Sequence, residues 1–343
     1  MRTNKYWEKR SKSRMLAYHK DSEKTITTVT AAYDKAISDI NAELDRIFSK
    51  YTKDGKLAPP DALKLLNQRE DFRALDALRE QLKGIKDPDI KRQPLNRLNA
   101  PAYRARLTRL QVLKERIYIA AKKVADVEIR ASQAGYIEVI DSAYYHTLFD
   151  LQKGIGLGFD VAAIPTKTVE AILKNPWSGA HFSKRVWHNT DVLADRLTEV
   201  ITSGLKSGAS IRKMRQEIED LGTMGKHGAA RLIRTETTYM ANAAEMESYE
   251  EAEVEEYMFI ATLDLRTSKI CQKHDHKIYK LSERKPGKTV PPLHPYCRST
   301  TRAWFGPELV EGMKRRARDP KTGKTYLVPQ SMTYKQWKER YVA

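Results

Sequence analysis

Residues 264–302 hold the side chains of this chain that are best suited to binding a metal ion. Both cysteines lie there, together with three of the eight histidines. Cys271 and His274 are separated by two residues, and so are His294 and Cys297. Each spacing can place two side chains around one ion across a tight turn, and a mixed set of thiolates and imidazoles suits tetrahedral zinc. The sequence therefore predicts a structural zinc site at these four residues.

The same residues are compatible with two other arrangements. Two reduced, buried cysteines can close a loop without a metal, while His294 forms a hydrogen bond within its proline-rich turn. A disulfide between the two cysteines is the third arrangement, and a reducing compartment disfavours it. The fourth ligand is the most open point, because His276 or Asp275 could take the place of His274.

The composition predicts a globular, largely helical protein that meets polyanions. The chain has 343 residues, enough for two or three domains, with 41% hydrophobic and 31% charged residues. Its formal net charge of +18 favours nucleic acid, acidic protein faces or anionic lipid. No apolar run is long enough to cross a bilayer, and the basic N-terminus has no apolar signal segment, so we expect no membrane partner. Two cysteines without a disulfide framework agree with synthesis in the cytoplasm.

Helical periodicity dominates the first half of the chain. Between residues 21 and 51, apolar residues recur at alternating steps of three and four, which predicts an amphipathic helix that needs a long partner. Residues 102–151 repeat this pattern, and the prolines of residues 86–101 predict a connector. We therefore expect a basic N-terminal arm over residues 1–20 and an elongated helical bundle or hairpin over residues 21–153.

The second half predicts shorter helices followed by strands. Helices are expected over residues 184–205, 211–221 and 229–251, with a glycine loop over residues 222–228 between the last two. The period then changes to alternation, which predicts three strands of a small antiparallel sheet over residues 257–263, 276–281 and 299–305. Three short strands bury little area alone, so the helix over residues 229–251 is expected to cover them.

The predicted fold class is α+β and mostly α. An elongated N-terminal helical bundle or hairpin precedes a C-terminal helical module with a small antiparallel sheet. We place this module at residues 160–310 and a basic C-terminal tail at residues 311–343.

Three sequence blocks carry a resemblance to a known family. The first is Trp-His-Asn-Thr at residues 187–190 with Gly-Ala-Ser at residues 208–210, and the second is Ala-Arg-Leu-Ile-Arg-Thr-Glu-Thr at residues 230–237. The third joins Asp-Leu-Arg-Thr at residues 264–267 to Pro-Pro-Leu-His-Pro-Tyr-Cys-Arg at residues 291–298. In these blocks the chain resembles the Mu F-like (SPP1 gene-seven-type) minor head proteins of tailed bacteriophages. Many relatives have a glycine where His276 stands and a further cysteine where Ser299 stands.

The resemblance implies a role in head morphogenesis. Proteins of this family enter the procapsid in few copies, associate with the portal protein and with the major capsid or scaffolding protein, and are linked to DNA packaging or ejection. The expected location is the procapsid or virion head, after synthesis in the cytoplasm of the bacterial host. We expect no enzymatic activity, because no set of nucleophile, base and oxyanion donors can be named. The alternatives are a basic DNA-binding protein or a metal-dependent nuclease of a mobile element.

Charged residues of the second and third blocks predict a polar network beneath the sheet. The expected ion pairs are Glu236 with Arg266 and Asp264 with Arg234, with Thr267 beside them. Basic residues near both ends of the chain are candidate contacts with double-stranded DNA or an acidic partner: Lys9, Arg10, Arg14, Arg315, Arg316 and Arg318.

Overall fold

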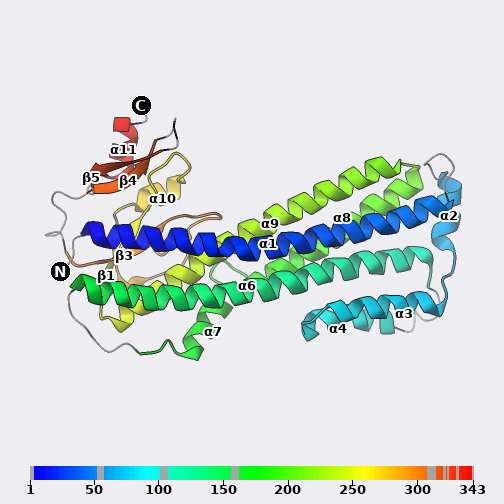
Figure 1. The fold of residues 1–343 in the computed structure, drawn as a ribbon, viewed down its shortest axis with the longest axis horizontal. Helices are drawn as coiled ribbons and strands as arrows, with labels where there is room; N and C mark the ends of the chain where they lie inside the picture. Colours follow the sequence, from blue (N-terminus) through cyan, green and yellow to red (C-terminus); the bar gives the residue numbers. More distant parts are fainter. Residues whose placement is uncertain are drawn as a thin grey trace. The chain divides into compact units, whose positions relative to one another are not determined.

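The computed structural model describes residues 4–51, 58–100, 107–155, 162–306, 314–319, 322, 324–329 and 332–341. The fold is mostly helical, and two small antiparallel sheets lie in the C-terminal part of the chain (Figure 1). This confirms the predicted α+β, mostly α class. Among the described residues, no helix combines the length and apolarity needed to cross a membrane.

Contacts divide the chain into two compact units that interleave in sequence. Unit 1 comprises residues 1–24, 133–181 and 231–343, and unit 2 comprises residues 25–132 and 182–230. Three long helices contribute residues to both units: α1 (Asn4–Tyr51), α6 (Arg109–Ile155) and α9 (Ile211–Glu251). The sequence instead predicts consecutive segments, because the periodicity of a helix does not show where its packing partners change.

The remaining elements each belong to one unit. Unit 2 also contains α2 (Pro59–Asn67), α3 (Phe72–Gln81), η1 (Leu82–Gly84), α4 (Pro88–Asn99) and α8 (Phe182–Ser207). Unit 1 also contains α7 (Thr166–Lys174), β1 (Glu256–Ile260), α10 (Lys269–His274), β2 (Ile278–Lys280), η2 (Leu281–Glu283), β3 (Thr300–Trp304), β4 (Lys314–Arg318), β5 (Thr325–Pro329) and α11 (Tyr334–Tyr341).

The predicted N-terminal arm is the first part of α1 and belongs to the core of unit 1. Trp7 and Tyr18 are buried. Trp7 lies in a hydrophobic cluster with Leu151 and Tyr257. A Cβ atom at Gly154 would lie 2.1 Å from the Trp7 ring, so the absence of a side chain there allows the indole to pack. The segment is helical because its aromatic residues face other elements of the unit rather than solvent.

The stretch predicted as a connector, residues 86–101, contains helix α4. Asp87 caps this helix, since its side chain accepts hydrogen bonds from the backbone N–H groups of Asp89 and Ile90. Pro88 occupies the first turn, where a missing N–H costs no helical hydrogen bond. The proline therefore marks the start of a helix rather than an irregular link.

The predicted basic tail is folded in its described part. β4 and β5 form a two-stranded antiparallel sheet, and α11 follows it. Trp337 of α11 is fully buried in a cluster that includes Leu263, Val328 and Tyr334. The aromatic residues of this segment thus anchor it to the rest of unit 1.

The glycine loop predicted over residues 222–228 lies inside the continuous helix α9. A Cβ atom at Gly222 would lie 2.7 Å from Cγ1 of Ile37. At Gly225 it would lie 2.4 Å from Cε1 of Tyr33. The two glycines therefore let α9 approach α1 closely within unit 2, and this packing outweighs the tendency of glycine to interrupt a helix.

Replacing Gly225 with alanine should lower the free energy of unfolding by about 1–3 kcal/mol, because the added methyl group overlaps the buried Tyr33 ring. Gly228 is the matched control, since a Cβ atom there would meet nothing within 4 Å. Gly228→Ala should raise stability by about 0.5–1 kcal/mol through its higher helix propensity. Urea unfolding of both variants measures the difference, and equal stabilisation by the two would contradict the close packing of α9 on α1.

The three-stranded sheet of unit 1 has the order β2-β1-β3, and both pairs are antiparallel. Tyr257 in β1 lies opposite Tyr279 in β2 and Ala303 in β3. β1 is buried along most of its length, as its uniformly apolar sequence predicts. Met246 and Tyr249 of α9 share a hydrophobic cluster with Tyr257, so α9 packs on this sheet as predicted.

Candidate metal centre

Three of the four predicted ligands meet in unit 1. Sγ of Cys271 lies 3.3 Å from Nε2 of His294 and 3.6 Å from Sγ of Cys297, and the three ligand atoms all lie within 4.8 Å of one another. A tetrahedral zinc with bonds of about 2.3 Å to sulfur and about 2.0 Å to nitrogen would hold two sulfurs roughly 3.8 Å apart and a sulfur and a nitrogen roughly 3.5 Å apart. The observed spacing therefore fits a zinc site.

The spacing also separates this arrangement from a disulfide. Both cysteines are free and buried, and their sulfurs lie 3.6 Å apart, whereas a disulfide joins them at about 2.05 Å. The same distances are compatible with a metal-free clasp, in which the thiols and the imidazole share hydrogen bonds.

A hydrogen bond fixes which nitrogen of His294 can act as a ligand. Its Nδ1 lies 2.8 Å from the carbonyl oxygen of Pro295. Since a carbonyl only accepts, Nδ1 must carry the proton and donate it. Nε2 then presents a lone pair toward Cys271, which is the tautomer that metal ligation requires.

The electrostatic surroundings of the two thiols differ. The pKa of Cys297 lies well below its ordinary value, chiefly because its sulfur accepts a hydrogen bond from Cys271 and further ones from backbone N–H groups. The pKa of Cys271 is raised by the hydrogen bond to Cys297 and by burial. The pKa of His294 is raised by its hydrogen bond to Cys297. A divalent cation in the centre would supply positive charge that stabilises both sulfurs as thiolates.

Local structure places the two cysteines. Ser268 is the N-cap of α10, and its Oγ accepts a hydrogen bond from the backbone N–H of Cys271 at 3.3 Å. The backbone N–H of Cys297 donates to the carbonyl of His294 at 3.2 Å and closes a tight turn. Tyr296 within this turn has φ of 59°, a left-handed conformation.

Helix α9 holds this turn from one side. Oγ1 of Thr235 accepts the backbone N–H of Tyr296 at 3.0 Å, and Oγ1 of Thr238 donates to the carbonyl of Cys297 at 3.0 Å. His19 of α1 lies behind them, with Nε2 at 3.2 Å from Oγ1 of Thr238. The sequence did not predict these roles. Thr235 belongs to the second resemblance block and Thr238 directly follows it, whereas no sequence signal points to His19.

The fourth predicted ligand, His274, lies outside the cluster. Its Nδ1 forms a 2.7 Å hydrogen bond with the hydroxyl of Tyr279, and its ring packs on Phe259 at 5.4 Å. Asp275 is buried and accepts the backbone N–H of Ala261 at 2.9 Å. His276 has φ of 63°, a left-handed conformation that glycine adopts without strain. Neither of these two alternative ligands belongs to the group formed by the three metal-binding candidates.

The charged residues of the sequence blocks pair differently from the prediction. Asp264 accepts both terminal nitrogens of Arg298, at 2.6 Å and 2.8 Å. This bidentate contact holds the pKa of Asp264 below its usual range, although burial raises it. Arg234 instead bonds to Glu23 at 2.7 Å. Arg298 takes the place expected for Arg234 because it follows Cys297 directly and reaches Asp264 from the metal-centre turn.

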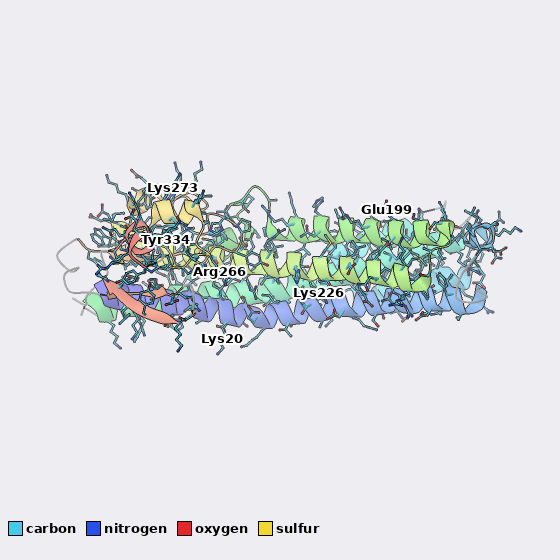
Figure 2. All side chains as sticks on the ribbon, turned by 90° about the horizontal axis from the view of Figure 1, so that it is seen from above. Lys20, Glu199, Lys226, Arg266, Lys273 and Tyr334 are labelled. Atoms are coloured by element: carbon cyan, nitrogen blue, oxygen red, sulfur yellow. The ribbon has the colours of Figure 1, made fainter. Side chains whose placement is uncertain are left out.

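The other members of the predicted network have separate partners. Glu236 accepts Nε1–H of Trp177 at 3.0 Å. Arg266 is exposed (Figure 2), and only its backbone N–H is seen to bond to Asp264, at 3.0 Å. Thr267 donates from Oγ1 to Asp264 at 3.2 Å. The predicted ion pair between Glu236 and Arg266 is therefore wrong. Glu236 binds the indole of Trp177, and the side chain of Arg266 is exposed.

Two of the predicted DNA contacts form ion pairs inside unit 1. Arg10 and Arg14 both lie 2.5 Å from the carboxylate of Asp150. Lys9 and Arg318 are exposed. The side chains of the other two candidates, Arg315 and Arg316, lie outside the described residues.

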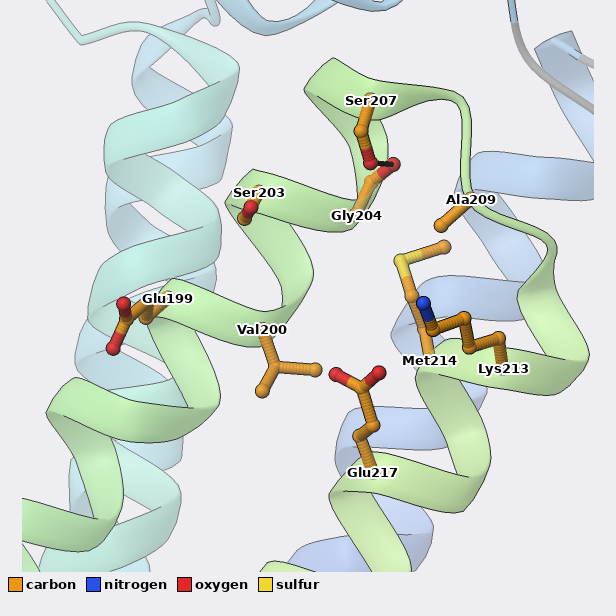
Figure 3. A pocket seen from close by; sticks show the side chains of 9 residues that line it. All are labelled: Glu199, Val200, Ser203, Gly204, Ser207, Ala209, Lys213, Met214 and Glu217. Carbon is orange, nitrogen blue, oxygen red and sulfur yellow. Dashed lines mark hydrogen bonds between the residues drawn. The ribbon is translucent and has the colours of Figure 1, made fainter.

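A pocket of about 230 Å³ lies in unit 2, between α8 and α9 (Figure 3). Val200 and Glu217 approach each other across it in this view. Its lining is mixed: Glu199, Val200, Ser203, Gly204, Ser207, Ala209, Lys213, Met214 and Glu217. The pocket contains none of the predicted ligands, which belong to unit 1.

Comparison with known proteins identifies a family domain that contains the candidate metal centre. Residues 195–302 match the family model described as Phage Mu protein F like protein. These residues form a Mu F-like domain. The domain includes the second half of α8, all of α9, β1 and β2 and the start of β3, together with Cys271, His294 and Cys297. The resemblance stated from the sequence is thereby confirmed.

One curated protein that is similar to the chain is named as an enzyme. The chain is 25% identical over 181 residues to NAD(+)--arginine ADP-ribosyltransferase EFV of Enterococcus faecalis (strain ATCC 700802 / V583). The match covers 50% of the chain and 37% of that protein, so the chain spans little more than a third of its length. No solved structure matches the chain.

Proposed function

We propose that the chain is a minor head protein of a tailed phage or prophage. It associates with the portal protein and with the major capsid or scaffolding protein, resides in the procapsid and virion head, and supports DNA packaging or ejection. The observation that carries this proposal is the Mu F-like domain at residues 195–302. A folded sheet with a Cys/His centre in this domain suits a rigid docking module.

We propose further that Cys271, His294 and Cys297 hold a structural zinc ion. The metal would join α10 to the turn at residues 294–297 and so close the loop between β2 and β3. The donor types, the spacing of the ligand atoms and the tautomer of His294 all support this assignment. With three protein ligands, one coordination position would remain for a water or another group.

We infer that the chain acts without enzymatic activity. The two sulfurs of the centre are buried, so they are poorly placed to meet a substrate from solution. The name of the curated relative describes a much longer protein, and its activity does not transfer on a match that covers 37% of it. A metal-dependent nuclease would require a hydrated ion that a phosphate group can reach, whereas both sulfur ligands of this centre are buried.

Co-expression with the portal protein of the same genetic element tests the proposed function. The full chain is expected to co-migrate with portal rings in size-exclusion chromatography and to be recovered in procapsids. The Cys271→Ser, Cys297→Ser variant should lose this association if the centre orders the docking surface. A chain that elutes apart from portal rings and is missing from procapsids would contradict the proposal.

A further inference from the structure

The excess positive charge of the chain is confined to its two ends. Residues 21–264 hold 36 basic and 37 acidic residues, so they are almost neutral. Residues 1–20 hold 7 basic and 1 acidic residue, and residues 265–343 hold 19 basic and 6 acidic residues. Both charged segments belong to unit 1. Arg10 and Arg14 of residues 1–20 pair with Asp150. The exposed excess of positive charge therefore lies mainly in residues 265–343.

Six exposed lysines gather on three consecutive elements of the Mu F-like domain. Two lie on α10, two flank or end the edge strand β2, and two lie in the turn after η2; we call them the lysine surface: Lys269, Lys273, Lys277, Lys280, Lys285 and Lys288. Figure 2 shows Lys273 at the outer side of α10. Lys269 and Lys273 share one face of this helix, since they are four residues apart.

The lysine surface carries little compensating charge. Within the part of the chain that the structure describes, none of its six lysines lies within ion-pair distance of a carboxylate, whereas the neighbouring Arg284 pairs with Glu247 and Glu250. The acidic residues near these lysines are Asp275, which is buried and bonds to backbone N–H groups, the exposed Glu283, and the half-exposed Glu256, which lies opposite Lys280 in the β1–β2 pair. The surface therefore presents a concentrated positive potential to solvent.

We propose that the lysine surface binds the phosphate backbone of double-stranded DNA. The proposal rests on the proposed function, because a head protein that supports packaging or ejection meets the genome. Lysine is a flexible point charge, which suits phosphate contacts that carry no sequence information. It is depleted at protein–protein interfaces, which argues against an acidic protein partner. Ile270 and Ile278 are exposed singly, as apolar residues commonly are.

A duplex fits this surface better than a single strand. Proteins that hold single strands stack the bases on exposed aromatic rings. The aromatic residue of β2, Tyr279, is only half-exposed, its hydroxyl is bound to His274 and its ring lies 5.7 Å from that of Tyr257. Cys271 lies between Lys269 and Lys273 on α10, so the metal centre and the lysine surface share this helix.

The test is the salt dependence of duplex binding by the full chain. Fluorescence anisotropy with a short mixed-sequence DNA duplex is recorded between about 50 and 200 mM NaCl. The variant carries Lys269→Gln, Lys273→Gln, Lys277→Gln and Lys280→Gln. Each lost phosphate contact should make the log–log slope shallower by about 0.9, so the variant with four substitutions should lose about 3.6 units of slope and on the order of 100-fold in affinity at low salt.

The control variant removes the same charge from unit 2, with Gln at four exposed lysines: Lys64, Lys114, Lys184 and Lys206. It should retain the slope of the unaltered chain. An equal loss in both variants would show that net charge alone drives binding and would overturn the proposal. So would an unaltered chain that binds polyglutamate but no duplex, or lysine-surface substitutions without effect, in which case the lysines only protect the edge strand from aggregation.

Procapsid incorporation separates this proposal from the proposed function. The lysine-surface variant should still enter procapsids and co-migrate with the portal protein, because only DNA contact is removed. Loss of duplex binding together with loss of incorporation would place the lysines at a protein interface and overturn the DNA assignment. A chain that binds DNA through these lysines but never enters particles would overturn the proposed function alone.

Discussion

Chelation of zinc should strongly destabilise unit 1, which holds the metal centre, while leaving unit 2 folded. A structural zinc supplies roughly 10 kcal/mol of apparent folding energy in small domains, so loss of a site with three protein ligands should cost several kcal/mol. The reason is local, since Cys271, His294 and Cys297 join α10 to the turn at residues 294–297, within the connection between β2 and β3. Elemental analysis should find about one zinc per chain, and hydrogen exchange with and without EDTA should show the loss of protection confined to unit 1.

The histidines provide a matched pair of variants. His294→Ala removes a ligand candidate and should abolish zinc binding, whereas His274→Ala removes a ring bound to Tyr279 and should leave zinc content unchanged. Loss of metal in both would mean that His274 moves into the centre. If the chain contains no metal and EDTA does not change its melting temperature, the zinc assignment is wrong and the thiols and imidazole form the metal-free hydrogen-bonded clasp.

The second large effect is expected at Arg14. Above pH 7, where Glu245 is ionised, Arg14→Met should lower the free energy of unfolding by about 3–5 kcal/mol, because the buried carboxylate of Glu245 loses its cation. The guanidinium lies 2.5 Å from Asp150 and 3.8 Å from Glu245, and both carboxylates are almost fully buried. Arg10 still pairs with Asp150, so Glu245 is the group left without compensation. Chemical unfolding of Arg14→Met beside Arg14→Met, Glu245→Gln measures this, and the double variant should recover part of the loss.

Glu245 also predicts a pH dependence. Burial raises its pKa to about 7 from a model-compound value of 4.5. The folded state therefore binds this proton more tightly than the unfolded state, so the contribution is fully present below pH 4.5 and is lost as pH rises through 7. Glu245→Gln should flatten the fall in stability across this window. An identical pH profile in the variant would show that other groups, such as Glu128 with its pKa also raised to about 7, carry the dependence.

The periodicity of apolar residues sufficed to predict most helices and strands. The elements that were not predicted depend on packing between residues far apart in the sequence. The apolar stripes of α1 and α6 and the uniformly apolar β1 were predicted because burial on one or both faces leaves a direct mark on the sequence. The glycines inside α9 were taken for a loop, since only the approach of Ile37 and Tyr33 explains them. Residues 1–20 were predicted as an arm and not as a packed helix for a related reason: Trp7 packs on residues far away in sequence.

In the candidate site, too, the contacts set by local sequence were predicted and those set by long-range packing were not. The sequence spacing correctly predicted that Cys271, His294 and Cys297 lie close together. Each of them is in a short turn or helix whose geometry is set by neighbouring residues. His274 was assigned by the same spacing, yet the hydroxyl of Tyr279 holds its ring elsewhere. Charge complementarity alone did not identify the partner of Asp264, since several arginines were available and the fold brings Arg298 to it.

The measurement that tests the central claim most directly is quantitative mass spectrometry of purified particles from the genetic element that encodes the chain. The chain should be found in procapsids and in DNA-filled heads, at far fewer copies than the major capsid protein. Intact, infectious particles that lack the chain would contradict its assignment as a head protein.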